Sequence, residues 1–188
     1  MKNKNKTVWS NRFKSKTSQS FQKIGSSIHI DKRLYEQDIA ASIVHTQMLS
    51  KQKIIKSEDA NKIINGLKKI KAQIDKGNFE FKEKFEDIHL NIEKALFDII
   101  GPSAGYMHTA RSRNDQVVTD FKLWIKDASK EILKDISLVM KNLLKKAEKN
   151  TDTVMPGLTH LKNAQPISFA HYLLSYFEML KRDKKRFE

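Results

Sequence analysis

The stretch VVTDFKLWIKDASKEILKDISLVMKNLLKKA, residues 117–147, contains no glycine and no proline. Its apolar residues recur at spacings of three and four, on the stripe Val117, Phe121, Trp124, Ala128, Ile132, Ile136, Val139, Leu143 and Ala147. This spacing predicts one amphipathic helix, about 45–50 Å long at 1.5 Å per residue. Because a single helix cannot bury such a stripe, we expect it to lie in a bundle of comparable helices.

Helical patterns also cover most of the remaining chain. Ser57 is the expected N-cap and Gly77 the expected C-cap of a helix with the apolar face Ala60, Ile63, Leu67, Ile70 and Ile74. Further helices are expected over Leu34–Ser50, over Ile88–Ile100 and from near Pro166 onward. Since no strand alternation or internal repeat is evident, the sequence predicts an all-α fold. We expect an N-terminal helical domain over residues 1–112 and the first, incomplete part of a long-helix bundle over residues 113–188.

The composition restricts the classes of function. With 39% hydrophobic and 31% charged residues, the 188-residue chain is typical of a globular protein with a real core. The absence of cysteine excludes disulfides and thiolate metal sites. No apolar run is long enough to span a membrane, and Met1–Lys6 does not resemble a signal peptide, so we expect a cytoplasmic protein with no membrane partner. The net charge of +14 is spread over nearly every polar face, and we therefore expect no nucleic-acid partner.

Three segments interrupt the helical pattern and collect polar groups: Gly25–His29, Gly101–Gln116 and Met155–Pro166. Arginines bind carboxylates bidentately, and the start of a helix favours an anion. Hydroxyl and amide groups can fix the orientation of such a substrate, and a histidine can transfer a proton near neutral pH. These groups are Ser27, Ser112, Arg113, Asn114, Thr159 and His160. Together they favour removal of a proton next to a carboxylate, and no pattern indicates a metal or a cofactor.

Each of these residues also has a purely structural interpretation. Asn114 or Asp115 is expected to cap the long helix, Arg113 can form a surface salt bridge, and a lone histidine such as His160 is commonly structural. Asp87 and Asn91, one turn apart on one helix face, can simply be solvated. The functional interpretation depends on their occurrence together.

Four blocks carry a family resemblance. They are Trp9-Ser-Asn-Arg-Phe13, Glu86-Asp-Ile-His-Leu-Asn-Ile-Glu93, His108-Thr-Ala-Arg-Ser-Arg-Asn-Asp-Gln116, and Met155-Pro-Gly-Leu-Thr-His-Leu161 with Ala164-Gln-Pro166. In this order they resemble the argininosuccinate lyases of the fumarase/aspartase superfamily. The third block separates these enzymes from fumarases and adenylosuccinate lyases. The resemblance runs from about Val8 to the last residue.

The resemblance implies a reversible β-elimination of argininosuccinate to arginine and fumarate, the last step of arginine biosynthesis. It implies that His160 takes part in the proton abstraction, and that Ser27, Ser112, Arg113, Asn114 and Thr159 hold the substrate. It places Asp87, His89 and Asn91 at the edge of the pocket, toward the guanidinium side. It also implies a homotetramer whose long helices form a common core, with each active site built from three subunits.

Some residues depart from the family pattern. Ser10 and Asn11 replace two glycines, Ala41-Ser42 replaces a Gly-Ser pair, and Leu158 and Lys162 replace a common tyrosine and glutamine. A further serine-bearing catalytic loop of the family would lie beyond residue 188, so we expect an N-terminal portion of the enzyme that is inactive alone. The alternatives are another lyase of the superfamily, such as an adenylosuccinate lyase, a non-enzymatic crystallin-like relative, and a basic helical binding protein.

Overall fold

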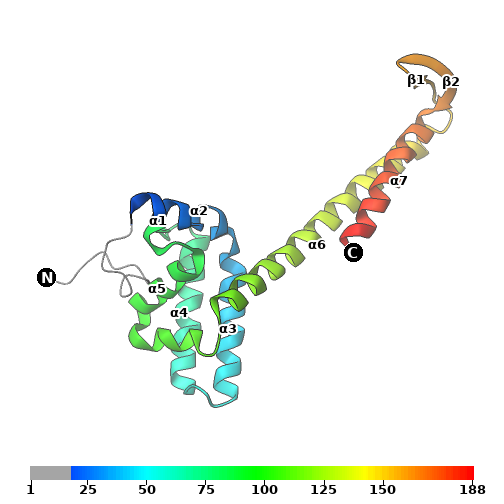
Figure 1. The fold of residues 1–188 in the computed structure, drawn as a ribbon. Helices are drawn as coiled ribbons and strands as arrows, with labels where there is room; N and C mark the ends of the chain where they lie inside the picture. The colour runs from blue at the N-terminus through cyan, green and yellow to red at the C-terminus, as the bar shows by residue number, and fades with distance from the viewer. Residues whose placement is uncertain (1–17) are drawn as a thin grey trace. The chain divides into compact units, whose positions relative to one another are not determined.

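The structure is a computed structural model that describes residues 18–188 (Figure 1). The block Trp9–Phe13, which includes Ser10 and Asn11, lies outside the described residues. The chain forms two compact units, one ending at Trp124 and the other beginning at Ile125. Helix α6 (Arg113–Glu148) contributes residues to both units. The domain boundary expected between residues 112 and 113 stays a prediction.

The first unit is a packed group of helices. Its α-helices are α1 (Gln19–Gly25), α2 (Ile28–Asp31), α3 (Tyr35–Lys51), α4 (Ser57–Asp75), α5 (Ile88–Ile100) and the start of α6. Three 3₁₀ segments connect them: η1 (Lys32–Leu34), η2 (Glu83–Phe85) and η3 (Gly101–His108). In Figure 1, α3, α4 and α5 lie side by side, and they supply most of the core: Ile39, Leu49, Ile63, Leu67, Ile70, Ile88, Ile92 and Leu96. Burying each of these side chains contributes roughly 1.5–3 kcal/mol.

Helix α4 tests the expected start and stop signals. Gly77 has φ +71°, its N–H donates to the Ile74 carbonyl at 2.9 Å, and the Asn78 N–H donates to the Gln73 carbonyl at 2.9 Å. This pair of bonds is a Schellman motif, in which glycine occupies the left-handed position after the C-cap. The expected stop is confirmed to within one residue, since Lys76 is the C-cap and Gly77 follows it. The expected start was wrong by one residue, because Ser57 is already helical and Lys56 is the N-cap.

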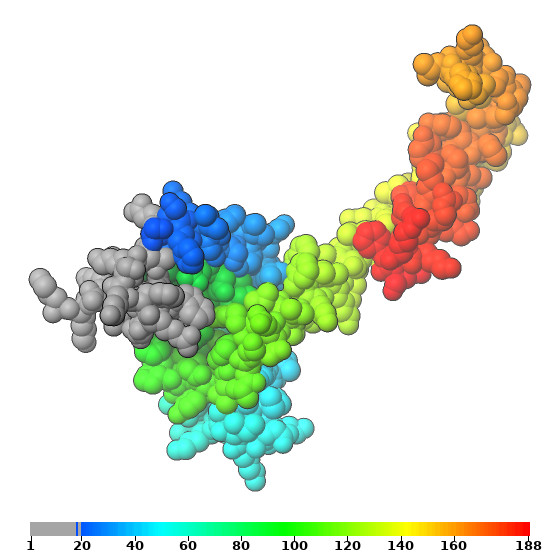
Figure 2. Space-filling view, in the orientation of Figure 1, coloured from blue at the N-terminus to red at the C-terminus, as the bar shows by residue number. Residues whose placement is uncertain are grey.

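The second unit contains a hairpin that the sequence analysis did not predict. Strands β1 (Val154–Thr159) and β2 (Lys162–Ser168) pair antiparallel, with Pro156 opposite Pro166. The two prolines suggested a loop, but both strands of a two-stranded ribbon are edges, where proline is tolerated. Helix α7 (Phe169–Phe187) consequently starts after Pro166, with Ser168 as its N-cap. Figure 2 shows the hairpin, in orange, at the end of this unit beyond α7 and the adjoining part of α6.

The apolar stripe of α6 stays mostly uncovered. Near its C-terminal end, Ala147 packs with Ala170 and Leu173 of α7. Farther along the helix, Phe121 and Val139 remain 50% and 49% exposed. The expectation that this helix cannot bury its stripe by itself is confirmed, and the exposed part is available to further helices.

None of the described helices combines the length and the hydropathy that crossing a membrane requires.

Candidate active site

The block His108–Gln116 turns the chain into α6. The Asn114 N–H donates to Ser112 Oγ at 3.2 Å, and the Ser112 N–H donates to Asp115 Oδ2 at 3.2 Å. This reciprocal arrangement is a capping box with Ser112 at the N-cap position. The expectation that Asn114 or Asp115 caps the helix was wrong, because the helix begins earlier, at Arg113, and Asp115 only completes the box. The Asn114 side chain is exposed and has no hydrogen-bond partner among the described residues.

Arg113 lies where α6 begins and faces two acidic side chains. Its Nε lies 3.9 Å from Asp87 Oδ2, and its Nη2 lies 3.6 Å from Glu93 Oε2. Its Nη1 donates to Gln116 Oε1 at 3.1 Å. The side chain is 32% exposed, and a guanidinium has five N–H donors, so it retains donors for a carboxylate that arrives from solvent. The exposed N–H groups of the first turn of α6 favour the same charge.

Ser27 and Asp87 lie in one acidic cluster. Ser27 Oγ donates to Asp31 Oδ2 at 2.6 Å, and Asp31 Oδ1 accepts the Ile88 N–H at 3.1 Å. Asp87 is the N-cap of α5 and accepts the Leu90 N–H at 2.7 Å. Burial raises the pKa of the Asp31 carboxyl, the hydrogen bond from Ser27 opposes this, and the charge of Asp87 adds to it. The structure thus brings together Ser27, Asp87 and Arg113.

Asn91 lies next to this cluster but is turned to the backbone. Its Oδ1 accepts the Lys82 N–H at 2.8 Å, and its Nδ2 donates to the Asp87 carbonyl at 2.8 Å and the Lys82 carbonyl at 3.2 Å. The residue is 3% exposed. Its amide therefore holds the backbone before α5 in place. Asn91 can influence a substrate pocket only by holding that backbone.

His89 is buried between two aspartates. Its Nδ1 lies 3.1 Å from Asp38 Oδ1 and 3.4 Å from Asp120 Oδ2. Gln116 Nε2 donates to the same Asp38 oxygen at 2.5 Å. These four side chains, from α3, α5 and α6, are at most 2% exposed and form the buried polar cluster. Asp38 Oδ2 and both oxygens of Asp120 have no hydrogen-bond partner among the described residues.

The two carboxyl groups of the buried polar cluster differ in how readily they bind a proton. Burial raises the pKa of Asp120 to about 8, and the neighbouring charge of Asp38 raises it as well. Burial acts on Asp38 in the same sense, but the hydrogen bonds with His89 and Gln116 keep its pKa below the usual value. Of the two carboxyl groups, Asp120 therefore binds a proton more readily, and such a proton can donate to Asp38 and satisfy an otherwise orphaned oxygen.

Asp38, Asp120 and His89 also offer possible metal ligands, with one ligand atom each within 4.8 Å of the others. However, Asp38 Oδ1 already accepts a hydrogen bond from Gln116 and lies within hydrogen-bond distance of His89 Nδ1. The arrangement is that of a hydrogen-bonded network.

Of the four residues in the buried polar cluster, only His89 was expected from the sequence. The available signal was spacing: Asp38, Ser42 and Thr46 recur every four residues and are all fully buried, and Gln116 and Asp120 are also four apart. Polar residues at the spacing of a core-facing stripe indicate a buried network.

Asp120 should make the stability of the protein depend on pH. Its folded-state pKa lies above the unfolded value, so its contribution is fully present below about pH 4 and is lost as pH rises toward about 8. Each pH unit in this window costs up to about 1.4 kcal/mol. We expect Asp120→Asn to be more stable than the wild type at pH 9, with a flatter dependence between pH 5 and 9, as measured by urea unfolding.

The exposed Asp98 on α5 provides the matched control, because Asp98→Asn should leave the pH dependence unchanged. If Asp120→Asn is destabilised equally at pH 5 and pH 9, the assignment of the proton to Asp120 is wrong.

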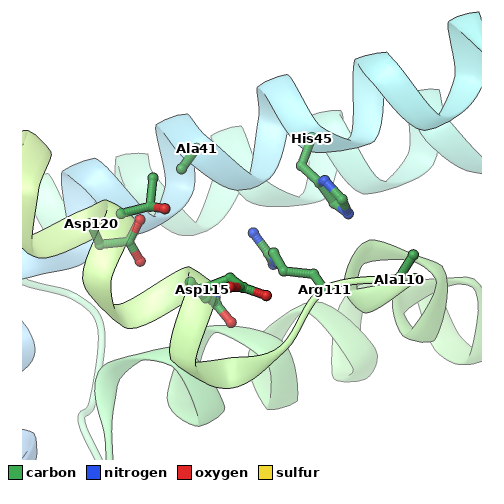
Figure 3. Close-up of a pocket in the computed structure, with 8 residues that line it drawn as sticks. Ala41, His45, Ala110, Arg111, Asp115 and Asp120 are labelled. Carbon is green, nitrogen blue, oxygen red and sulfur yellow. The ribbon is translucent and has the colours of Figure 1, made fainter.

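A cavity of about 300 Å³ lies beside the buried polar cluster, between α3 and the start of α6 (Figure 3). Figure 3 shows Arg111 reaching toward α3, which carries Ala41 and His45. Both terminal nitrogens of Arg111 donate to Ser42 Oγ, at 3.2 and 3.3 Å. His45 Nε2 lies 2.9 Å from the Thr109 carbonyl. Ser42 and His45 thus fix the segment that leads into the cap of α6.

Thr159 and His160 lie at the end of the β1–β2 hairpin. His160 and Leu161 form the two-residue turn, with φ +51° and +61°, and Thr159 pairs with Lys162. Two positive φ angles are typical of a type I′ turn, which glycine and asparagine favour. Non-glycine residues in this region cost roughly 1–2 kcal/mol each, and such strain is often found at functional sites. Both Thr159 and His160 are exposed. They belong to the second unit, whereas the other site residues described above belong to the first.

Comparison with known proteins gives consistent matches. A protein family described as lyase matches residues 11–188. The argininosuccinate lyase of Pelagibacter ubique is 59% identical over 188 residues, which is 100% of this chain and 41% of that protein. The argininosuccinate lyase of Bartonella bacilliformis is 47% identical over 179 residues, 95% of this chain and 38% of that protein. The chain therefore spans about two fifths of the length of these relatives.

Solved structures share the fold. EDDS lyase in complex with formate superposes with a TM-score of 0.72 at 28% identity, covering 84% of this chain and 31% of that one. A variant of EDDS lyase with bound fumarate superposes with a TM-score of 0.73 at 26% identity, covering 93% of this chain and 35% of that one.

Proposed function

Because the chain belongs to the lyase family that matches residues 11–188, we propose that it serves the reversible β-elimination of argininosuccinate to arginine and fumarate. The observation that carries the proposal is the 59% identity, over all 188 residues, to a relative named argininosuccinate lyase. The elimination breaks the bond between carbon and the guanidino nitrogen while a base removes a proton from the adjacent carbon. The electron pair of that C–H bond forms the double bond of fumarate. The nitrogen keeps the pair of the C–N bond and takes up a proton, so that arginine leaves as a neutral guanidine or, after a second protonation, as a guanidinium.

The start of α6 supports the binding of the succinyl carboxylates. Ser112, Arg113 and Asn114 combine a hydroxyl, a partly exposed guanidinium and a free amide at a helix N-terminus. All three groups favour an anion, and the negative charge on the substrate grows as the proton leaves. A fumarate molecule bound to a variant of EDDS lyase, which has the same fold, agrees with a dicarboxylate ligand.

The acidic cluster supports the binding of the cationic end of the substrate. Ser27, Asp31 and Asp87 present carboxylate and hydroxyl oxygens, and Asp87 Oδ2 lies 3.9 Å from Arg113 Nε. A guanidinium is a bidentate partner for a carboxylate, so Asp87 can exchange its long contact with Arg113 for one with the substrate. Asn91 would act by fixing the backbone of Asp87, and His89 by its place in the buried polar cluster.

Thr159 and His160 supply the remaining chemistry in this proposal. His160 is exposed on a strained turn, and an imidazole can both accept and donate a proton, which suits a group that takes part in the proton abstraction. The exposed apolar side chains of α6 support assembly with other copies into a homotetramer, in which the hairpin of one copy serves the binding residues of another. The proposal includes a cytoplasmic protein without a cofactor.

The test uses a protein that we call the completed enzyme: this chain joined to the remaining part of the Pelagibacter ubique relative. We expect it to release fumarate from argininosuccinate and not from adenylosuccinate, as followed by the ultraviolet absorbance of fumarate. The relative alone is the positive control. A preference for adenylosuccinate would contradict the proposal, and so would a completed enzyme that folds and releases no fumarate from either compound.

A further inference from the structure

We propose that Gln116 is a positioning residue that holds Arg113 for the substrate by linking it to the buried carboxylate of Asp38. The inference rests on the proposed function of Arg113. Gln116 is 2% exposed and lines the cavity beside α3, but both ends of its amide are already bonded within the protein, so we expect it to act on the substrate through Arg113.

The contacts of Gln116 fix the direction of its amide. Its Oε1 accepts from Arg113 Nη1 at 3.1 Å, and its Nε2 donates to Asp38 Oδ1 at 2.5 Å. Turning the amide over would place an N–H₂ group against the guanidinium and an oxygen against a carboxylate, which is repulsive at both ends. The side chain therefore has one stable orientation.

Only an amide meets both demands at neutral pH. Arg113 requires an acceptor and Asp38 requires a donor. An ionised carboxylate in the same place would keep the acceptor but lose the donor, and an apolar side chain would lose both. Because Gln116 is neutral, it orients the Arg113 guanidinium without neutralising it, and the positive charge remains available to a substrate carboxylate.

The Asp38 side chain, to which Gln116 donates, is itself held in place by buried neighbours. Asp38 of α3 faces His89 of α5 and Asp120 of α6, and Arg111 adds a positive charge nearby. These groups and Arg113 are charged or titratable neighbours of Gln116, and Asp115 and His45 line the same cavity as Gln116. Since Asp38, His89 and Asp120 are buried and come from three different helices, Gln116 ties Arg113 to the rigid part of the first unit.

The experiment compares Gln116→Glu and Gln116→Met in the completed enzyme at pH 6 and pH 8, with kcat and KM for argininosuccinate measured separately. At pH 8 the ionised carboxylate introduced by Gln116→Glu repels Asp38 and pairs fully with Arg113, so KM should rise at least about tenfold while kcat changes less. At pH 6 the same carboxyl, once protonated, donates to Asp38 again, and the ratio of KM to that of the wild type should shrink. The Met variant should show a raised KM at both pH values.

The exposed Gln73 on α4 provides the control, since Gln73→Glu should leave kcat and KM unchanged at both pH values. An active wild-type completed enzyme whose KM is unaffected by Gln116→Glu, or raised equally at pH 6 and pH 8, would overturn the positioning role while leaving the proposed function intact. A Gln116→Glu variant that cannot fold even at pH 6 would also overturn it. An inactive wild-type completed enzyme would instead count against the proposed function.

Discussion

Replacing His160 by asparagine in the completed enzyme is expected to lower kcat by about 10²–10⁴, the usual contribution of a positioned acid or base. Folding should be unaffected, because His160 is exposed and asparagine is well suited to its positive φ of +51°. The measurement is kcat for fumarate release together with the melting temperature of the same preparation.

Leu161 provides a matched control in the same turn. It is 97% exposed and has φ +61°, so Leu161→Asn relieves the same backbone strain without removing an imidazole. We expect this variant to keep at least about a third of the wild-type kcat. If His160→Asn and Leu161→Asn have equal activities, His160 has no part in the proton transfer.

The second large effect is expected at Asn114. Asn114→Asp removes an amide donor and places a negative charge where a substrate carboxylate would bind. Losing a hydrogen bond to a charged group costs about 1.5–3 kcal/mol, so kcat/KM should fall about tenfold to a hundredfold or more. The melting temperature should stay the same or rise slightly, because Ser112 is the cap and an acidic residue in the first turn suits the helix dipole.

Asn61→Asp makes the same chemical change at an exposed position near the start of α4. It should leave both kcat/KM and stability within experimental error of the wild type. If Asn114→Asp keeps full activity, the amide of Asn114 does not bind the substrate.

The sequence predicted the helices well wherever spacing and stop signals agreed. The apolar spacing of α4 and the left-handed Gly77 are local signals, and both are confirmed. The hairpin was missed because Pro156 and Pro166 are local signals against a strand, and only their pairing across the ribbon makes them compatible. The cap of α6 was misplaced because Ser112, Asn114 and Asp115 are all good capping residues, and only the backbone shows which one precedes the helix.

The candidate site was predictable in its exposed parts and not in its buried ones. Ser27 and Arg113 were expected from their chemistry and Asp87 from the family resemblance; in the structure Ser27 bonds Asp31 of the acidic cluster, and Asp87 lies 3.9 Å from Arg113. Asp31, Asp38, Asp120 and Gln116 were not expected, because a buried polar residue depends on partners that are distant in the sequence: Gln116 and Asp38 are 78 residues apart. Their roles come from burial and pairing, which composition and spacing alone do not specify.

The proposed reaction is a reversible elimination in which a proton leaves the carbon next to the one that bears nitrogen. The most direct test is the reverse reaction of the completed enzyme with arginine and fumarate in D₂O, followed by NMR and mass spectrometry. A guanidino nitrogen of arginine loses a proton and bonds one carbon of fumarate, while the adjacent carbon takes a deuteron from the enzyme. We expect argininosuccinate with a single carbon-bound deuterium, on that adjacent carbon. An adduct without carbon-bound deuterium, or no adduct from a folded enzyme, would contradict it.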